Sequence, residues 1–453
     1  MARSRPLTPL LITGVVTLHL VLLLILFPQA PDDGGLRGFV DLSYQDSGRT
    51  LAGSMPYRDF LLEYPPGLLL WMILPHLFAA GRLAYRVPFF AEVALVDLVV
   101  LLTLVMSARA ARLSLPRVLG LYTLGLVLLG PVAAFRLDLV PAALTALAVL
   151  AWQRDRPVLA AVALAAGAAT KLYPLLLLPP LVAQQWARGR HRVCATVGAA
   201  ALTLTVLAIP AFLAGPQGLL HSVRFQADRH TEVEAIWATL PLLLHVFWHL
   251  PLEVPNLGRA FVIIGPGDAL GAAGTPTLLV ACLVIYWRWW RVPRLQSGPG
   301  DATEVESLLL GAAALVLSAT ILTKVLSPQY LLWALPPLAL LSTRSWWTRA
   351  ALCAFYCALP LTQWLFPDHF GDLVGLLEPQ AVVVLALRNL LLLLAFAALM
   401  GSLWQMGRCA GTTLHCGHVP PLGDDDPRAG PVSSTAGTWR TLAQHMWQRG
   451  RPC

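Results

Sequence analysis

Long runs of apolar residues recur from one end of the chain to the other, separated by short polar segments. A helix of about 20 apolar residues spans a bilayer, and these runs lack the alternation of apolar and polar positions typical of a barrel strand. Lipid offers no water to satisfy backbone polar groups, so only helices or closed barrels cross it. The pattern therefore predicts an all-α polytopic membrane protein.

About twelve spans are predicted, over residues 8–28, 86–106, 118–134, 139–153, 157–170, 172–186, 193–214, 270–290, 305–323, 329–343, 349–366 and 379–400. Two apolar stretches, 67–80 and 236–250, are too short to cross comfortably, so we expect interfacial or re-entrant helices there. The expected domains are a transmembrane domain over 1–404 and a tail over 405–453. The tail is rich in Gly, Pro, Ser and Thr, and we expect it to be disordered and cytoplasmic.

Arginine marks the loops on one side of this bundle. Arginines gather near residues 109–117, 154–156, 188–192, 288–294 and 344–349. Short basic loops tend to stay in the cytoplasm. With these loops inside, both termini are cytoplasmic, and the two long loops, 29–85 and 215–269, lie outside.

Composition narrows the class further. The chain is 57% hydrophobic and 12% charged, which excludes a soluble domain of this length. The net charge of +8 comes from arginines in the short loops, so it does not indicate nucleic-acid binding. The seven cysteines lie mostly in apolar runs or in the tail, and no disulfide framework is predicted. The strong preference for arginine over lysine is typical of a GC-rich bacterial genome, so we expect a bacterial plasma membrane.

The first outer loop contains the highest density of candidate functional residues. Its acidic residues are interleaved with tyrosines and prolines, and they include Asp41, Asp46, Asp59 and Glu63 with Tyr44, Tyr57 and Tyr64. A carboxylate at the membrane surface can take a proton from a hydroxyl, and a tyrosine offers a flat face and a polar tip to a sugar. The alternative is an ordinary solvated acidic loop.

The chain has only two lysines, and they occupy similar places. Lys171 and Lys324 each follow a threonine at the outer end of a predicted span. Both are candidates for binding a phosphate as point charges; the alternative is that they anchor the helix ends at the lipid headgroups.

Other charges lie in or near the predicted spans. Arg136 and Asp138 share a very short outer turn, where a local salt bridge is the simplest prediction. Glu92, Asp97 and Arg388 lie inside spans, where charge is costly, and we expect them to pair among themselves.

Three motifs that suggest metal or nucleotide chemistry are discounted. His245 and His249 have the i, i+4 spacing of a metal pair but lack a third ligand. The spacing of the tail residues Cys409, His415, Cys416 and His418 fits no standard zinc site. The acidic run at 424–426 lacks the α/β domain that a DxD motif needs. We therefore expect no metal and no cofactor.

The order of motifs along the chain resembles glycosyltransferase family 87 of the GT-C superfamily, which includes phosphatidylinositol-mannoside mannosyltransferases. The resemblance extends from the first span to about residue 400. The motifs are Asp-x-x-Tyr from Asp41 to Tyr44, Pro-Tyr-Arg-Asp from Pro56 to Asp59, Glu-Tyr-Pro-Pro from Glu63 to Pro66, Arg136 and Asp138, Thr-Lys-Leu-Tyr-Pro from Thr170 to Pro174, and Ser-Pro-Gln-Tyr from Ser327 to Tyr330. The sequence departs from the family near Arg229, where Ala235 follows Glu234 in place of the frequent serine.

The resemblance implies a GT-C-type bundle and a membrane hexosyltransferase. Such an enzyme transfers a sugar, expected to be mannose, from a polyprenyl-phosphate-sugar donor to a lipid or cell-envelope glycan acceptor. Transfer takes place with inversion on the outer face of the plasma membrane. The donor, the acceptor and membrane lipids are the expected partners, and nucleic acid is not.

The resemblance also implies roles for individual residues. Asp41 matches the general base through the Asp-x-x-Tyr pattern, and Asp46, in the same short segment, is its rival. A phosphate leaves without protonation if cations stabilise it, so no metal is required. The expected substrate-binding residues are Tyr44, Tyr57, Glu63, Arg136, Asp138, Lys171, Arg229, Lys324, Gln329, Tyr330 and Arg388. The alternative function is a polytopic transporter or lipid flippase, whose binding residues would lie near the middle of the membrane.

Overall fold

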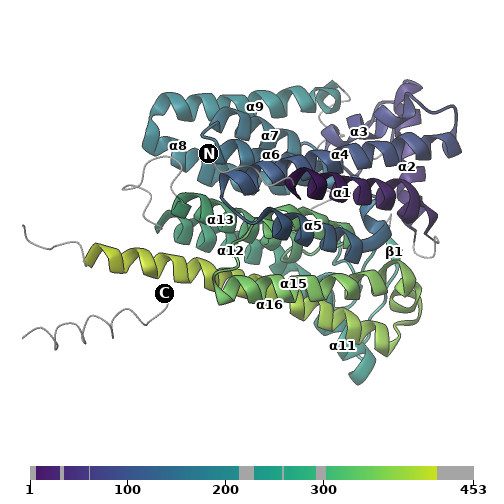
Figure 1. The fold of residues 1–453 in the computed structure, drawn as a ribbon. Coiled ribbons are helices and arrows are strands. Elements are labelled where there is room, and N and C mark those ends of the chain that lie inside the picture. The colour runs from purple at the N-terminus through teal and green to yellow at the C-terminus, as the bar shows by residue number, and fades with distance from the viewer. Residues whose placement is uncertain are drawn as a thin grey trace, which may run out of the picture.

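The computed structural model describes residues 7–30, 35–60, 62–213, 229–257, 260–291 and 302–415. The long helices in these ranges run roughly parallel or antiparallel to one another (Figure 1). By length and composition, eight helical segments in the described ranges can cross a membrane. They are Thr8–Gln29, Arg82–Ala110, Leu115–Ala133, Arg190–Leu213, Pro266–Arg291, Thr303–Ile321, Trp346–Asp368 and Pro379–Met406. The predicted all-α polytopic membrane fold is confirmed.

The helices of the first half of the chain are α1 (Leu7–Val21), α2 (Leu36–Leu51), α3 (Pro66–His76), α4 (Arg82–Ala110), α5 (Leu115–Leu129), α6 (Leu139–Gln153), α7 (Pro157–Ala168), α8 (Leu178–Arg188) and α9 (Arg190–Leu213). Those of the second half are α11 (Ile236–Trp248), α12 (Gly274–Arg291), α13 (Ala302–Ile321), α14 (Leu331–Ala339), α15 (Trp346–Gln363) and α16 (Pro379–His415). Two short strands, β1 (Asn256–Leu257) and β2 (Ala260–Phe261), pair antiparallel.

The remaining predicted spans and both short apolar stretches also form helices. The shorter helices α6, α7, α8 and α14 occupy the other four predicted spans, and α3 and α11 form at the two stretches expected to be interfacial. Helix α2 is an addition, because no helix was predicted within residues 36–51. The predicted tail starts at residue 405, whereas α16 continues to His415, and residues 416–453 lie outside the described ranges.

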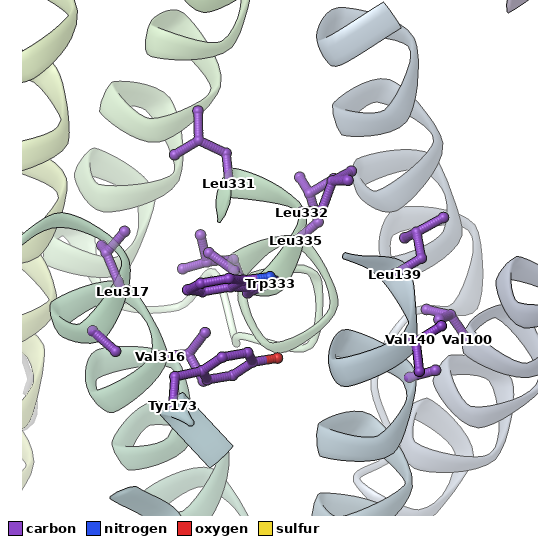
Figure 2. Packing of buried hydrophobic residues seen from close by; sticks show 14 of the residues in the cluster. Val100, Leu139, Val140, Tyr173, Val316, Leu317, Leu331, Leu332, Trp333 and Leu335 are labelled. Carbon is purple, nitrogen blue, oxygen red and sulfur yellow. The ribbon is translucent and has the colours of Figure 1, made fainter. Parts of the chain in front are cut away.

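Helices α13 and α14 form the centre of the bundle. Every residue from 307 to 322 and from 331 to 341 is buried. Figure 2 shows the Trp333 ring of α14 lying over Tyr173, with Leu139 of α6 and Val316 of α13 nearby. Small residues let the helices approach: a Cβ at Gly125 of α5 would lie 2.2 Å from the Leu335 side chain.

The arginine-rich loops gather at one end of the bundle. Arg188 and Arg192 both bind Asp155 of the α6–α7 loop, and Arg188 also lies 3.4 Å from Glu304 of α13. Helices α2 and α3 and strand β1 lie at the opposite end, on the right in Figure 1. The short basic loops and the long outer segments are therefore on opposite ends, as the sequence predicts. Which end faces the cytoplasm stays a prediction.

The charges inside the spans pair differently from the prediction. Asp97 of α4 accepts hydrogen bonds from His19 of α1 at 2.7 Å and from Tyr122 of α5 at 2.6 Å. Arg388 pairs instead with Glu234 of the second long loop at 3.3 Å. The carboxylate of Glu92 is buried and accepts no hydrogen bond from the described residues. The prediction that Glu92, Asp97 and Arg388 pair among themselves is wrong, because Arg388 lies on α16 with Glu234 as its partner, whereas Glu92 and Asp97 are both acidic residues of α4.

The pair of His19 and Asp97 should be important for stability. Both side chains are fully buried and join α1 to α4. Removing one member of a buried, hydrogen-bonded pair usually costs about 3–5 kcal/mol. We expect Asp97→Leu to destabilise the protein by about this amount in reversible unfolding in detergent. The double variant H19L/D97L should recover part of the loss, because neither His19 nor Asp97 remains, although the Tyr122 hydroxyl loses its acceptor. Equal losses in the single and double variants would contradict this interpretation.

Candidate active site

The first outer loop is held closely against the end of α7. The Gly67 N–H donates to the Ala169 carbonyl at 2.8 Å, and a Cβ at Gly67 would lie only 2.7 Å from that oxygen. The loop just before Gly67 is fixed by Tyr57, whose hydroxyl donates to the Tyr64 carbonyl at 2.5 Å. This contact brings Tyr64 next to Lys171, which lies two residues beyond Ala169.

Lys171 lies in an aromatic box. Its ammonium nitrogen is 4.9 Å from the centre of the Tyr64 ring, 4.7 Å from that of Tyr330 and 5.7 Å from that of Trp333. The nearest carboxylate oxygen is on Asp138, at 4.0 Å. The lysine side chain is only 16% exposed, yet its ammonium donates no hydrogen bond to any described residue. The three rings and Asp138 therefore stabilise the cation, while its N–H groups donate to none of the described residues.

A stack of three aromatic rings forms one wall of this box. Tyr330 stacks on Trp333 at 4.1 Å between ring centres, and Trp333 stacks on Tyr173 at 4.5 Å. The Trp333 indole N–H donates to Asp138 at 3.0 Å, which fixes the carboxylate beside Lys171. Lys171 and Tyr173 follow α7, Asp138 precedes α6, and Tyr330 precedes α14, so three helix ends meet here. Gln329, next to Tyr330, accepts a hydrogen bond from Ser327 at 2.9 Å.

The second long loop supplies charge to the same region. Arg229 pairs with Glu232 at 2.8 Å. The Glu232 backbone N–H donates to the Lys324 carbonyl at 2.9 Å, which ties this loop to the turn after α13. Burial raises the pKa of Glu232, although the nearby charges of Arg229 and Lys171 oppose the shift. Glu63, Tyr64 and Tyr330 interact electrostatically with Arg229. Burial also raises the pKa of Tyr64 to about 12, so its hydroxyl stays neutral.

Arg136 and Asp138 have separate partners. Arg136 donates to the carbonyl of Leu36 at 2.9 Å and to that of Phe135 at 3.1 Å. Its guanidinium also lies 5.3 Å from the centre of the Phe39 ring. Arg136 thereby holds the start of α2, whereas Asp138 faces Lys171 and Trp333.

Arg388 anchors the second loop to α16. It is fully buried, and its Nη2 lies 3.3 Å from both the carbonyl and the carboxylate of Glu234. Its Nε and Nη1 have no acceptor among the described residues. The neighbouring Asn389 donates to Thr239 at 2.7 Å. Burial raises the pKa of Glu234 to about 7 against the effect of Arg388.

Asp41 and Tyr44 lie on α2 with partners of their own. Asp41 forms an ion pair with Arg82 and lies 3.5 Å from Arg86, both on α4. The hydrogen bond from Arg82 lowers the pKa of Asp41 despite its partial burial. Tyr44 stacks on His76 at 4.8 Å. Phe39 of the same helix packs edge-on against Tyr64 at 5.9 Å, so α2 adjoins the aromatic box through Phe39.

The structure thus brings one group of the predicted residues together. Lys171, Asp138, Tyr330, Glu63 and Arg229 interact with one another directly or electrostatically, and Lys324 joins them through its backbone. Sequence reasoning omitted four members from the predicted site: Tyr64, Tyr173, Glu232 and Trp333. Trp333 lies three residues after Tyr330, the last residue of the Ser-Pro-Gln-Tyr motif. This spacing places the two side chains next to each other on a helix and could have identified Trp333 from the sequence.

The sequence motifs that resembled metal sites can be compared with the described structure. His245 makes a hydrogen bond to the Leu250 carbonyl at 2.7 Å through its Nδ1. Among the residues with described positions, no three His, Cys, Asp or Glu side chains form a group suited to a metal ion. The tail residues from Cys416 onward lie outside the described ranges.

Gly67 offers a test of how the site is assembled. Gly67→Ala places a methyl group against backbone atoms of Ala169, so the loop must move away from α7. We expect the variant to fold but to lose stability by about 1–3 kcal/mol, the usual cost of overpacking. Its Tyr64 should become accessible, which chemical nitration of tyrosine followed by mass spectrometry would detect. Unchanged labelling of Tyr64 would show that the contact between Gly67 and Ala169 does not position the loop.

No protein-family model and no curated protein sequence matches the chain. Among solved structures, the chain is similar to the crystal structure of ArnT from Cupriavidus metallidurans bound to undecaprenyl phosphate. The sequence identity is 17% and the TM-score is 0.42, and the match covers 90% of this chain and 78% of the other.

Proposed function

We propose that this protein is a membrane glycosyltransferase that takes its sugar from a polyprenyl-phosphate-sugar donor. The donor phosphate binds at Lys171, and the sugar lies against the aromatic rings around it. By the resemblance of its motifs, the sugar is mannose, the acceptor is a lipid or cell-envelope glycan, and transfer proceeds with inversion.

The Lys171 ammonium carries this proposal, because it lies 4.0 Å from Asp138 but donates a hydrogen bond to no described residue. A partly buried ammonium in this position gains from a ligand that supplies close acceptors. A phosphate provides several strong acceptor oxygens and a charge of the right sign. As the bond from the sugar to the phosphate breaks, negative charge grows on the phosphate, and a preorganised cation in a low-dielectric site stabilises it. Arg229 and Lys324, on the adjoining loops, supply further positive charge.

The location of the cluster suits a lipid-linked substrate. The box lies where α6, α7 and α14 meet the long loops, at the end of the bundle opposite the arginine-rich loops. A polyprenyl chain can remain in the bilayer while its phosphate reaches the helix ends. Tyr64 and Tyr330 present aromatic rings, and Glu63, Asp138 and Glu232 present acceptors for sugar hydroxyls, a combination common in carbohydrate sites.

We propose Asp41 as the base that accepts the proton from the acceptor hydroxyl. The proton passes to the carboxylate while the acceptor oxygen forms its bond to the anomeric carbon and the phosphate departs. The ion pair with Arg82 keeps Asp41 ionised at neutral pH, which a base requires, although its lowered pKa weakens it as a proton acceptor. Its rivals are Asp46, which is buried on the same helix, and Glu232, which interacts electrostatically with Lys171 and Glu63. Arg136 and Arg388 support the site by holding α2 and the second loop.

A transfer assay tests the proposal. Purified protein in lipid vesicles is incubated with radiolabelled polyprenyl-phosphate-mannose and a lipid acceptor extract. We expect labelled product whose formation does not require added metal. Donor translocation across the vesicle without transfer would instead support a flippase, and neither transfer nor translocation would refute both functions. Replacing mannose with other sugars on the same carrier would establish donor specificity.

A further inference from the structure

A second group of cations and aromatic rings lies at the opposite end of the bundle, where α12 meets α16. The Arg291 guanidinium lies 4.4 Å from the centre of the Trp287 ring. The Arg288 guanidinium lies 4.1 Å from the Trp404 ring and 5.6 Å from the Trp287 ring. Two guanidinium groups and two indoles therefore interleave at one place.

Arg288 joins the two helices of this patch. It is buried, and its Nη2 donates to the Trp404 carbonyl at 2.9 Å. This bond fixes Trp404 beside Trp287, with 5.8 Å between the ring centres. The patch is thus part of the packing between α12 and α16 and has a defined geometry.

Several hydrogen-bond donors at the patch have no acceptor within the described part of the chain. The exposed Arg291 guanidinium and the indole N–H groups of Trp287 and Trp404 donate to no residue in the described part of the chain. Trp287 is 43% exposed and Trp404 is 39% exposed. Positive charge and free donors at one place suit an anionic group with several acceptor oxygens, such as a phosphate.

Apolar side chains continue from this patch along both helices. Leu283 and Leu279 of α12 are exposed about one and two turns before Trp287, and Leu390 and Leu394 of α16 are also exposed. Both helices are long and apolar enough to span a membrane. Such surfaces suit acyl chains, so the ligand that fits both parts of the patch is a phospholipid and not free phosphate.

We propose that Arg291, Trp287 and Trp404 form a binding site for the headgroup of an anionic phospholipid, with Arg288 positioning the two indoles. The acyl chains lie along the leucines of α12 and α16. The site is separate from the aromatic box around Lys171 and does not depend on the function proposed for it.

Native mass spectrometry of the full-length protein in detergent tests this site, with phosphatidylglycerol and phosphatidylcholine as probes. We expect selective retention of phosphatidylglycerol and about fivefold weaker binding in Arg291→Gln, the effect of one arginine at a membrane surface. Trp287→Leu should weaken binding to a similar extent without changing charge. Arg156→Gln is the matched control, because it removes an exposed arginine at the same end of the bundle and should change binding less than twofold.

Two other outcomes would overturn the proposal. Equal losses in Arg291→Gln and Arg156→Gln would indicate a diffuse surface charge in place of a site. Displacement of the lipid by millimolar inorganic phosphate would identify free phosphate as the ligand.

Discussion

Replacing Lys171 with glutamine should reduce sugar transfer by a factor on the order of 10²–10³, similar to the loss of one preorganised donor in an oxyanion hole. The glutamine retains hydrogen-bonding groups but lacks the charge that faces the departing phosphate. Apparent donor affinity should fall as well, because the same cation binds the phosphate before reaction. Turnover and donor binding are measured on the same purified variant.

Two further variants separate this effect from misfolding. Lys171→Arg retains the charge and should recover part of the activity, although the planar guanidinium fits the aromatic box differently. Tyr330→Phe retains the ring and should leave donor binding nearly unchanged. If Lys171→Gln unfolds at the wild-type temperature and binds donor normally, the phosphate binds elsewhere.

Asp41→Asn should reduce the transfer rate by a factor on the order of 10²–10⁴, the usual contribution of a general base. The change preserves shape, and donor binding should survive because the Lys171 box is untouched. The hydrogen bond from Arg82 weakens in this variant, so Arg82→Gln serves as its control. If Arg82→Gln alone abolished transfer, Asp41 would act through the structure of α2 and not as the base.

The pH dependence of transfer distinguishes Asp41 from its rival Glu232. A base works only when it is deprotonated, so the rate falls as the pH drops through its pKa. The pKa of Asp41 is lowered from its ordinary value of 3.8, so transfer should persist until the pH falls below this value. The pKa of Glu232 is raised from 4.5, so with Glu232 as the base the loss would begin at a higher pH. An acid limb above pH 4.5 that disappears in Glu232→Gln would move the base to Glu232.

The length and spacing of the apolar runs predicted most of the helices. Helix α2 was missed because its charged residues and its two glycines and two serines obscure the pattern. Its buried positions, Leu36, Phe39, Val40, Ser43, Asp46 and Ser47, nevertheless follow a helical period. Three of these six are polar, and the two serine hydroxyls bond to backbone carbonyls one turn earlier, so an apolar count alone does not reveal the buried face.

The candidate site was harder to predict than the helices. The two lysines were informative because the chain otherwise uses arginine. The partners of Lys171 could not be inferred from local pattern, since Tyr64 and Tyr330 lie more than a hundred residues away in the sequence and meet only when the helices pack. The pairing of Arg388 with Glu234 was missed for the same reason. Trp333 resembled an ordinary apolar residue of a span, and its bond to Asp138 becomes apparent only in three dimensions.

The most direct test of the account is a cryo-electron microscopy map of the protein bound to a non-hydrolysable polyprenyl-phosphate-sugar analogue. We predict phosphate density within hydrogen-bond distance, about 3 Å, of the Lys171 ammonium, between Tyr64 and Tyr330. The polyprenyl chain should leave this position along the apolar surface of the helices. Phosphate density near the middle of the bundle, or at the arginine-rich end with the Lys171 box unoccupied, would contradict the proposed active site.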